Sequence, residues 1–263
     1  TFAGQPRLGE LLQGSGLVLA ATPFDSFGLD ALFADLPVPD CLASRLARFR
    51  RVVSWFGARE PDYVERLGAL VPEVIVAPPV PDDDSPLTVW EHLVETLNAW
   101  DVARPAELHS LATTERWRIA ARTALMALGV DESRPLLIAH PGAGARWKQA
   151  PVARFAKALE RMVAGAGFEI VVHQGPADAQ AVDALVTALG IPAHRYLEPT
   201  LTELAGALAL AQAYLGSDSG VSHLAASVGT PSVILYPPET LRRWAPWAPS
   251  AVALGVGSEG DLS

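Results

Sequence analysis

The chain has 263 residues, 50% of them hydrophobic and 19% charged, which is enough to bury large cores in two domains of ordinary size. Its formal net charge is −9, and this acidic balance argues against nucleic acid as a partner, because phosphate binding needs concentrated lysine and arginine. No apolar run approaches the roughly 20 residues of a membrane-spanning helix, and the single cysteine, Cys41, cannot form an internal disulfide.

Strands and helices are predicted to alternate over the first hundred residues. Short apolar runs predict buried strands, and apolar residues at intervals of three and four predict helices. The predicted strands cover residues 16–21, 51–56 and 73–77, and the predicted helices cover residues 42–51, 62–70 and 89–100. This alternation indicates a parallel α/β layer structure. Thr1–Gly4 resembles the tail of a strand, so we expect residues of the natural protein to precede it.

A connector around residues 101–114 leads into a second alternating series. Its predicted strands cover residues 135–139, 168–173, 195–197, 213–215 and 232–236, and its predicted helices cover residues 114–128, 151–164, 177–189, 202–211 and 220–228. We therefore predict an incomplete N-terminal domain at residues 1–106 and a Rossmann-like, doubly wound domain at residues 107–263. Ligands of such sheets collect at the carboxyl ends of the strands.

The stretch Ala213–Pro237 combines a strand, a polar turn, a helix and a strand within 25 residues. Its turn, Gly-Ser-Asp-Ser-Gly, suits the N-cap and first turn of a helix. A helix N-terminus offers unpaired N–H groups and a positive dipole end to an anion. Asp218, Ser219 and Gly220 lie at this N-terminus, and His223 follows one turn inside. A routine helix start with a structural histidine is an equally good explanation of these residues.

A glycine-containing turn follows the strand predicted at residues 135–139. It has the sequence His-Pro-Gly-Ala-Gly and precedes Lys148. Gly142 and Gly144 would let the backbone approach a ligand closely, and a lysine supplies a mobile positive charge for a phosphate. The run has neither the Walker pattern nor the GxGxxG spacing, so it identifies no ligand by itself.

Asp178 follows the next predicted strand. A structural N-cap is the more frequent role for aspartate at a helix start, and the alternative role is to accept hydrogen bonds from ribose hydroxyls. Together the three strand ends offer glycines, an ammonium, a helix N-terminus and an imidazole. This set suits a nucleotide diphosphate, because fixed donors and cations stabilise the charge that builds up on a departing diphosphate.

The second half of the chain resembles glycosyltransferase family 9, the lipopolysaccharide heptosyltransferases and their relatives. The resemblance covers residues 131–249, in the runs LIAHPGAGARWKQAPVARFAKAL, VVHQGPADAQAV, LAGALALAQAYLGSDSGVSHLAASVGTPSVILYPP and RRWAPW, and its most specific part is DSGxxHLAAxxGTP. It implies a GT-B fold, with two Rossmann-like domains facing across a cleft. The implied activity is inverting transfer of a heptose from ADP-heptose to a lipid A–core acceptor.

The resemblance also implies a donor site and partners. The lysine and the DSGxxH turn would contact the donor diphosphate and sugar, and an acidic residue would lie near the nucleoside. The implied donor-binding residues are Gly142, Gly144, Lys148, Asp178, Asp218, Ser219, Gly220 and His223. The partners are a nucleotide diphosphate sugar and a saccharide or glycolipid acceptor, which implies a cytoplasmic protein in peripheral contact with the inner membrane. We expect no cofactor and assign no metal ligands.

The sequence departs from the family pattern at the implied general base. Activation of an acceptor hydroxyl needs a carboxylate within hydrogen-bond reach. Family members open with a strand and a Gly-Asp turn whose aspartate has this role, and we expect that unit upstream of Thr1. Asp25 is the nearest substitute, although a plain loop position is its more frequent role. Lys-Gln-Ala-Pro replaces a Lys-Arg-Trp-Pro type, and a C-terminal helix of the family is also not recognised.

Two other functions fit the same residues. A nucleotide-sugar epimerase can share this architecture and needs no acceptor site. A non-catalytic homologue would keep the donor pocket after losing the base. Incubation with the donor alone distinguishes an epimerase from a transferase.

Overall fold

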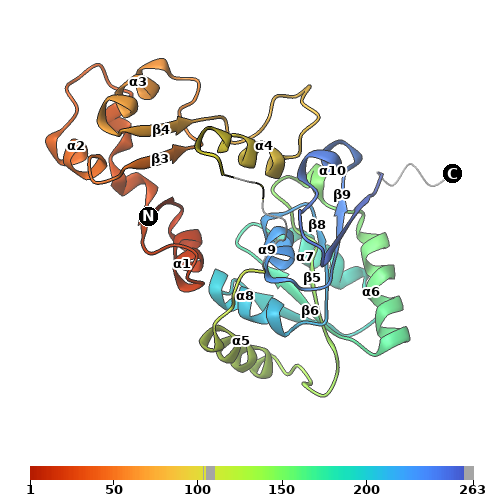
Figure 1. The fold of residues 1–263 in the computed structure, drawn as a ribbon. Helices are drawn as coiled ribbons and strands as arrows, with labels where there is room; N and C mark the ends of the chain where they lie inside the picture. Colours follow the sequence, from red (N-terminus) through yellow and green to blue (C-terminus); the bar gives the residue numbers. More distant parts are fainter. Residues whose placement is uncertain (103, 105–109, 258–263) are drawn as a thin grey trace. The chain divides into compact units, whose positions relative to one another are not determined.

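The computed structural model describes residues 1–102, 104 and 110–257. Its contacts divide the chain into two compact units, one made of Thr1–Gln13 and Leu17–Ala106 and the other of Gly14–Gly16 and Glu107–Ser263. Figure 1 shows the helices and strands of both units in chain order. No helix within the described ranges is both long and apolar enough to cross a membrane.

The first unit carries two separate pairs of parallel strands. β1 (Phe2–Gly4) pairs with β2 (Ala21–Pro23), and β3 (Arg51–Ser54) pairs with β4 (Glu73–Val76). Its helices are α1 (Pro6–Gly14), α2 (Asp40–Leu46), α3 (Pro61–Leu70) and α4 (Val89–Glu95), with short 3-10 helices at Phe24–Phe27, Leu29–Leu32 and Asn98–Trp100. Its core includes the fully buried side chains of Leu32 and Tyr63.

The strand predicted at residues 16–21 is wrong in its position. Helix α1 ends there instead, because Gly16 adopts a left-handed conformation with a φ of 78° and the N–H of Leu17 donates to the carbonyl of Leu12. Leu17 and Leu19 are exposed, so this apolar run does not form part of the core. Strand β2 begins only at the last residue of the predicted range.

Two helices of the first unit are shorter than predicted. α2 ends at Leu46, although the sequence predicts a helix over residues 42–51. α4 ends at Glu95 and is followed by a 3-10 helix, although the apolar period continues to residue 100. Periodicity locates both helices correctly but does not locate their C-terminal ends.

The second unit is built on a parallel sheet, which has six strands within the described residues. The strand order is β10-β9-β8-β5-β6-β7. The strands are β5 (Leu136–His140), β6 (Glu169–Gln174), β7 (His194–Leu197), β8 (Ala213–Ser217), β9 (Ser232–Tyr236) and β10 (Ala251–Gly255). The helices are α5 (Glu115–Ala127), α6 (Val152–Ala166), α7 (Ala179–Ala188), α8 (Leu201–Leu210), α9 (Gly220–Val228) and α10 (Pro238–Trp244), with a 3-10 helix at Arg146–Lys148. The predicted parallel α/β structure is confirmed.

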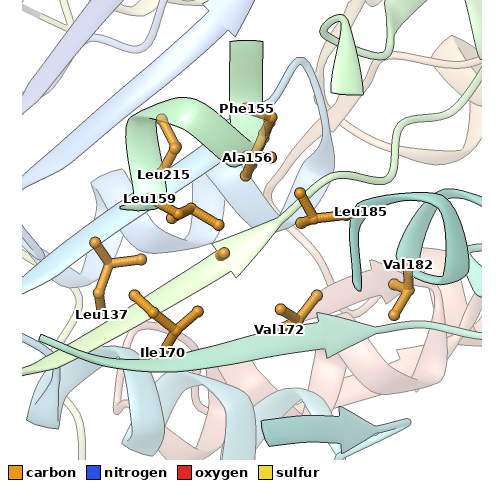
Figure 2. Packing of buried hydrophobic residues seen from close by; sticks show 10 residues of the cluster. Leu137, Phe155, Ala156, Leu159, Ile170, Val172, Val182, Leu185 and Leu215 are labelled. Atoms are coloured by element: carbon orange, nitrogen blue, oxygen red, sulfur yellow. The ribbon is translucent and has the colours of Figure 1, made fainter. Parts of the chain in front are cut away.

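Helices cover both faces of this sheet. α6 packs beside α7, while α5 and α9 both pack against α8. Figure 2 shows the core between α6, α7 and the sheet, where Phe155 and Leu159 of α6 meet Leu137 of β5 and Ile170 of β6. Strands that are buried on both faces are apolar throughout, which explains why apolar runs predicted them well.

The strand order reverses between β5 and β8. From β5 the chain proceeds through β6 to β7 at one edge of the sheet, whereas β8 lies on the other side of β5 and leads through β9 to β10. Crossovers on opposite sides leave a crevice at the carboxyl ends of the two central strands, and ligands of doubly wound sheets bind there. The loops after His140 and Ser217 begin at this point.

Candidate functional site

The loops that follow β5 and β8 bring Lys148 and Asp218 together. The Nζ atom of Lys148 lies 3.1 Å from Oδ2 of Asp218. The Asp218 side chain is only 4% exposed, whereas that of Lys148 is 23% exposed. The ammonium therefore lies between a buried carboxylate and solvent, where it can contact an anionic ligand without leaving Asp218, since it has three N–H donors.

Helix α9 begins at Gly220, two residues after Asp218. Ser219 is its N-cap residue, and the Ser219 hydroxyl accepts a hydrogen bond from the N–H of Ser222. Gly220, the first residue of the helix, is exposed. The helix N-terminus adds a partial positive charge beside Asp218, which favours an anion there. The structure therefore shows the helix-start role expected for Ser219, and contact of this N-terminus with a ligand stays a prediction.

His223 lies one turn into α9 and interacts with the same pair. Its backbone N–H donates to the carbonyl of Ser219. Burial lowers the pKa of the His223 imidazole; the nearby Asp218 carboxylate opposes this shift, and the Lys148 ammonium reinforces it. The imidazole is therefore neutral near pH 7, with one ring N–H that can donate to a ligand. Lys148, Asp218 and His223 form one electrostatic group.

A buried hydroxyl network holds these loops in place. The Ser217 hydroxyl donates to the carbonyl of Pro141 (3.1 Å) and accepts from the N–H of Ala150 (3.2 Å), so it ties β8 to both sides of the turn that carries Lys148. The Ser222 hydroxyl donates to the carbonyl of Ser217 and consequently accepts from the Tyr214 hydroxyl. Sequence reasoning missed this network. The signal for it was the small polar residue at the end of an apolar strand.

The two candidate glycines differ in what surrounds them. A side chain at Gly142 would overlap the Asp178 carboxylate and approach the His140 ring, so neighbours within the chain require glycine there. Gly144 is exposed, and a Cβ at this position would have no heavy atom within 4 Å. The space beside Gly142 is therefore filled by the Asp178 carboxylate. Of the two glycines, Gly144 is the one that leaves space for a ligand.

Asp178 occupies the N-cap position of α7, but its side chain does not cap the helix. Its backbone adopts a helical conformation instead of the extended one of a usual cap, and its carboxylate accepts a hydrogen bond from the N–H of Gly175 at 2.9 Å. The same carboxylate lies 3.9 Å from Nε2 of His140. The more frequent role expected from the sequence, a structural N-cap, is therefore wrong for this side chain.

A cavity of about 650 Å³ opens beside Lys148. Its lining includes Trp147 and Gln149, and also Tyr236 at the end of β9 and Glu239 at the start of α10. Its volume lies within the range of small-molecule sites. The Lys148 ammonium also lies 5.5 Å from the ring centre of Trp147. Asp25, the substitute base considered from the sequence, lies exposed on the Phe24–Phe27 helix of the first unit.

Comparisons with known proteins found a matching family model and solved structures of similar fold. The model of glycosyltransferase family 9 (heptosyltransferase) matches residues 75–262. ADP-heptose lps heptosyltransferase II of E. coli is 19% identical, with a TM-score of 0.68 over 96% of this chain and 80% of that chain. A family 9 glycosyl transferase of Veillonella parvula is 16% identical, with a TM-score of 0.69 over 97% and 85%. E. coli heptosyltransferase WaaC with ADP is 14% identical, with a TM-score of 0.65 over 97% and 82%. At these identities the solved structures show a shared fold, and no curated protein sequence matches significantly.

Proposed function

Because this chain belongs to glycosyltransferase family 9, we propose that it transfers a heptose or a related sugar from a nucleotide diphosphate sugar of the ADP-heptose type, with inversion, to an acceptor of the lipopolysaccharide-core type. The observation that carries the donor assignment is the meeting of Lys148 and Asp218 at the switch point between β5 and β8. We assign the donor to residues 107–263 and the acceptor to residues 1–106. Such an acceptor implies peripheral contact with the inner membrane.

The donor diphosphate is proposed to bind between Lys148 and the N-terminus of α9. Lys148 would keep one N–H on Asp218 and direct the others at phosphate oxygens. The exposed backbone at Gly220 would supply further donors, and the neutral His223 would donate one more from its ring. WaaC of E. coli, which shares the fold, is known with ADP, and this supports a diphosphate of the same kind here.

These residues would act mainly on the leaving group. Negative charge develops on the diphosphate as its bond to the anomeric carbon breaks, and fixed donors stabilise that charge without reorganising. Loss of one such donor costs about 100-fold or more in kcat. Asp218 would serve as a positioning residue, because it holds the ammonium at the place where the charge appears. The sugar would extend into the cavity lined by Trp147, Gln149 and Glu239.

The other candidate donor residues have less direct roles in this proposal. Gly144 would let the backbone of its turn approach a phosphate, because no side chain of the described residues fills the space beside it. Ser219 would contribute through its cap of α9, and Gly142 through the space it leaves for Asp178. Asp178 would lie near the nucleoside, and its second carboxylate oxygen would be the acceptor for a ribose hydroxyl.

A transfer assay tests the proposed function. The chain is incubated with ADP-heptose, with and without a deacylated lipopolysaccharide-core acceptor, and released ADP and glycosylated acceptor are quantified. Release of ADP that depends on the acceptor supports the transferase. An epimerised sugar formed from the donor alone would indicate an epimerase, and donor binding without turnover under either condition would indicate a non-catalytic homologue. Both of those outcomes contradict the proposal.

A further inference from the structure

Two buried histidines face each other at the ends of neighbouring strands. Parallel pairing of Ala139 with Val172 places His140 of β5 next to His173 of β6. Their Nδ1 atoms lie 3.0 Å apart, and their ring centres are 4.9 Å apart. Only 2% of His140 and 4% of His173 is exposed. Two nitrogens at this distance need either one shared hydrogen or one shared cation.

Both imidazoles present a ring nitrogen to the same place, because their Nδ1 atoms lie 3.0 Å apart. Neutral imidazoles keep a lone pair on one ring nitrogen, and this lone pair is the usual histidine ligand of a metal ion.

Asp178 brings a carboxylate to the same place. Its Oδ2 atom accepts a hydrogen bond from the N–H of Gly175 and lies 3.9 Å from Nε2 of His140. Gly142 and Gly175 both lie against this carboxylate, and a side chain at either position would collide with it. The backbone hydrogen bond and the two glycines therefore fix the orientation of the carboxylate, as outer contacts do for metal ligands.

The three side chains fit the geometry of one ion. One ligand atom from each of His140, His173 and Asp178 can be chosen so that all lie within 4.8 Å of one another. Ligand atoms at about 2.0–2.2 Å from a tetrahedral ion lie about 3.3–3.6 Å apart, so the side chains would close by about 1 Å on binding. Two imidazoles and one carboxylate suit zinc, iron(II) or cobalt(II) and leave coordination positions for water or a ligand.

We propose that His140, His173 and Asp178 bind one divalent transition-metal ion of this class. The ion would replace the hydrogen bond between the two rings and would neutralise the partly buried carboxylate. The site lies at the carboxyl ends of β5 and β6, whereas the Lys148–Asp218 pair comes from the loops after β5 and β8. The two sites are formed by different side chains. The proposal rests on the contacts of these three residues and not on the transferase assignment, although Asp178 is also proposed to lie near the nucleoside.

Cobalt(II) titration tests the site. The full chain is freed of metal with a chelator, and visible absorption is followed as cobalt is added, with calorimetry of zinc binding as a second readout. We expect saturation at one ion per chain. His173→Gln and Asp178→Asn should each weaken binding by more than about tenfold, the least that loss of a supporting contact costs a metal site. Melting curves show whether each variant is folded. If His173→Gln does not fold, the test rests on Asp178→Asn, which preserves the side-chain volume.

His194→Gln provides the matched control. His194 also pairs with a carboxylate, because its Nε2 lies 2.7 Å from Oε1 of Glu169. It differs from His140 and His173 because it lies at the amino end of its strand, β7. This variant should bind cobalt as the unmodified chain does. The proposal is overturned if the unmodified chain binds neither ion, if Asp178→Asn binds both ions with unchanged affinity, or if His194→Gln loses the site.

Discussion

The Lys148 ammonium lies 3.1 Å from the Asp218 carboxylate, although 70 positions separate the two residues in the sequence. The two partners are buried to different extents, because Asp218 is 4% exposed and Lys148 is 23% exposed. The pair is therefore a buried anion held by a cation that still reaches solvent. This asymmetry determines how each partner should respond to substitution.

Lys148→Met should reduce the free energy of unfolding more than Asp218→Asn. The lysine variant leaves a buried carboxylate without its cation. This loss costs several kcal/mol in a fully buried pair. Because the lysine is partly exposed, we expect about 1–3 kcal/mol here. The asparagine variant leaves an ammonium that can turn to water, so we expect less than about 1 kcal/mol. Urea unfolding at pH 7 measures both, and a larger loss for Asp218→Asn would contradict this description of the pair.

Ser217→Ala should lower both stability and donor affinity. It removes the hydroxyl that joins Pro141 and Ala150, and it leaves the Ala150 N–H without its side-chain acceptor. A buried polar group that loses its partner costs about 1–3 kcal/mol. Urea unfolding and calorimetry with ADP provide the two measurements. Ser250→Ala, which removes a longer 3.4 Å bond to the carbonyl of Ala226, is the control and should change neither value by more than about 0.5 kcal/mol.

Gly142→Ala and Gly144→Ala should separate folding from binding. The first variant places a methyl group against the Asp178 carboxylate, so we expect a loss of stability of about 1–3 kcal/mol. The second has open space at its Cβ, so its melting temperature should remain within a degree or two of the unmodified chain, while ADP affinity falls if a phosphate occupies that space. Equal stability of both variants would show that Gly142 is not required by its neighbours.

The lowered pKa of His223 should make stability depend on pH. Below the unfolded value of about 6.5, the unfolded chain takes up a proton that the folded chain does not, so stability falls as pH falls. One such group contributes up to about 1.4 kcal/mol per pH unit. His223→Gln should therefore reduce the slope of the stability curve between pH 6.5 and 5.5, to which the lowered pKa values of His140 and His173 also contribute, and leave its shape unchanged above pH 7.5. A slope identical to that of the unmodified chain would contradict the assigned burial.

The sequence was sufficient to predict the parallel sheet of the second unit and the strand ends that carry Lys148 and Asp218. Apolar runs identify strands covered on both faces, and the polar residues after them mark the carboxyl ends. The sequence could not show that β8 lies next to β5, since the strand order depends on which side each crossover takes. The contact between Lys148 and Asp218 consequently became visible only in the structure.

Other features depend on contacts between residues that lie far apart in the sequence. The Ser217 network joins positions 76 residues apart, and His140 and His173 are 33 residues apart without the spacing of a metal-binding motif. α10 and β10 were not predicted, because the proline- and tryptophan-rich run that holds α10 and the glycines near Gly255 show neither helical nor strand periodicity. The strand predicted at residues 16–21 is the opposite error, because an apolar run predicts a strand that the structure does not have there. Its apolar residues are exposed after the end of a helix.

Calorimetric titration with ADP tests the central claim most directly, using Lys148→Met and a control at the other lysine of the chain, Lys157→Met. Lys157 is exposed on α6 and is not among the candidate donor residues. Hydrogen bonds to charged groups contribute about 1.5–3 kcal/mol, so Lys148→Met should weaken ADP binding by about tenfold or more. Lys157→Met should leave affinity unchanged. Equal affinity of the unmodified chain and a folded Lys148→Met variant would contradict the assignment of the Lys148–Asp218 pair to the donor diphosphate.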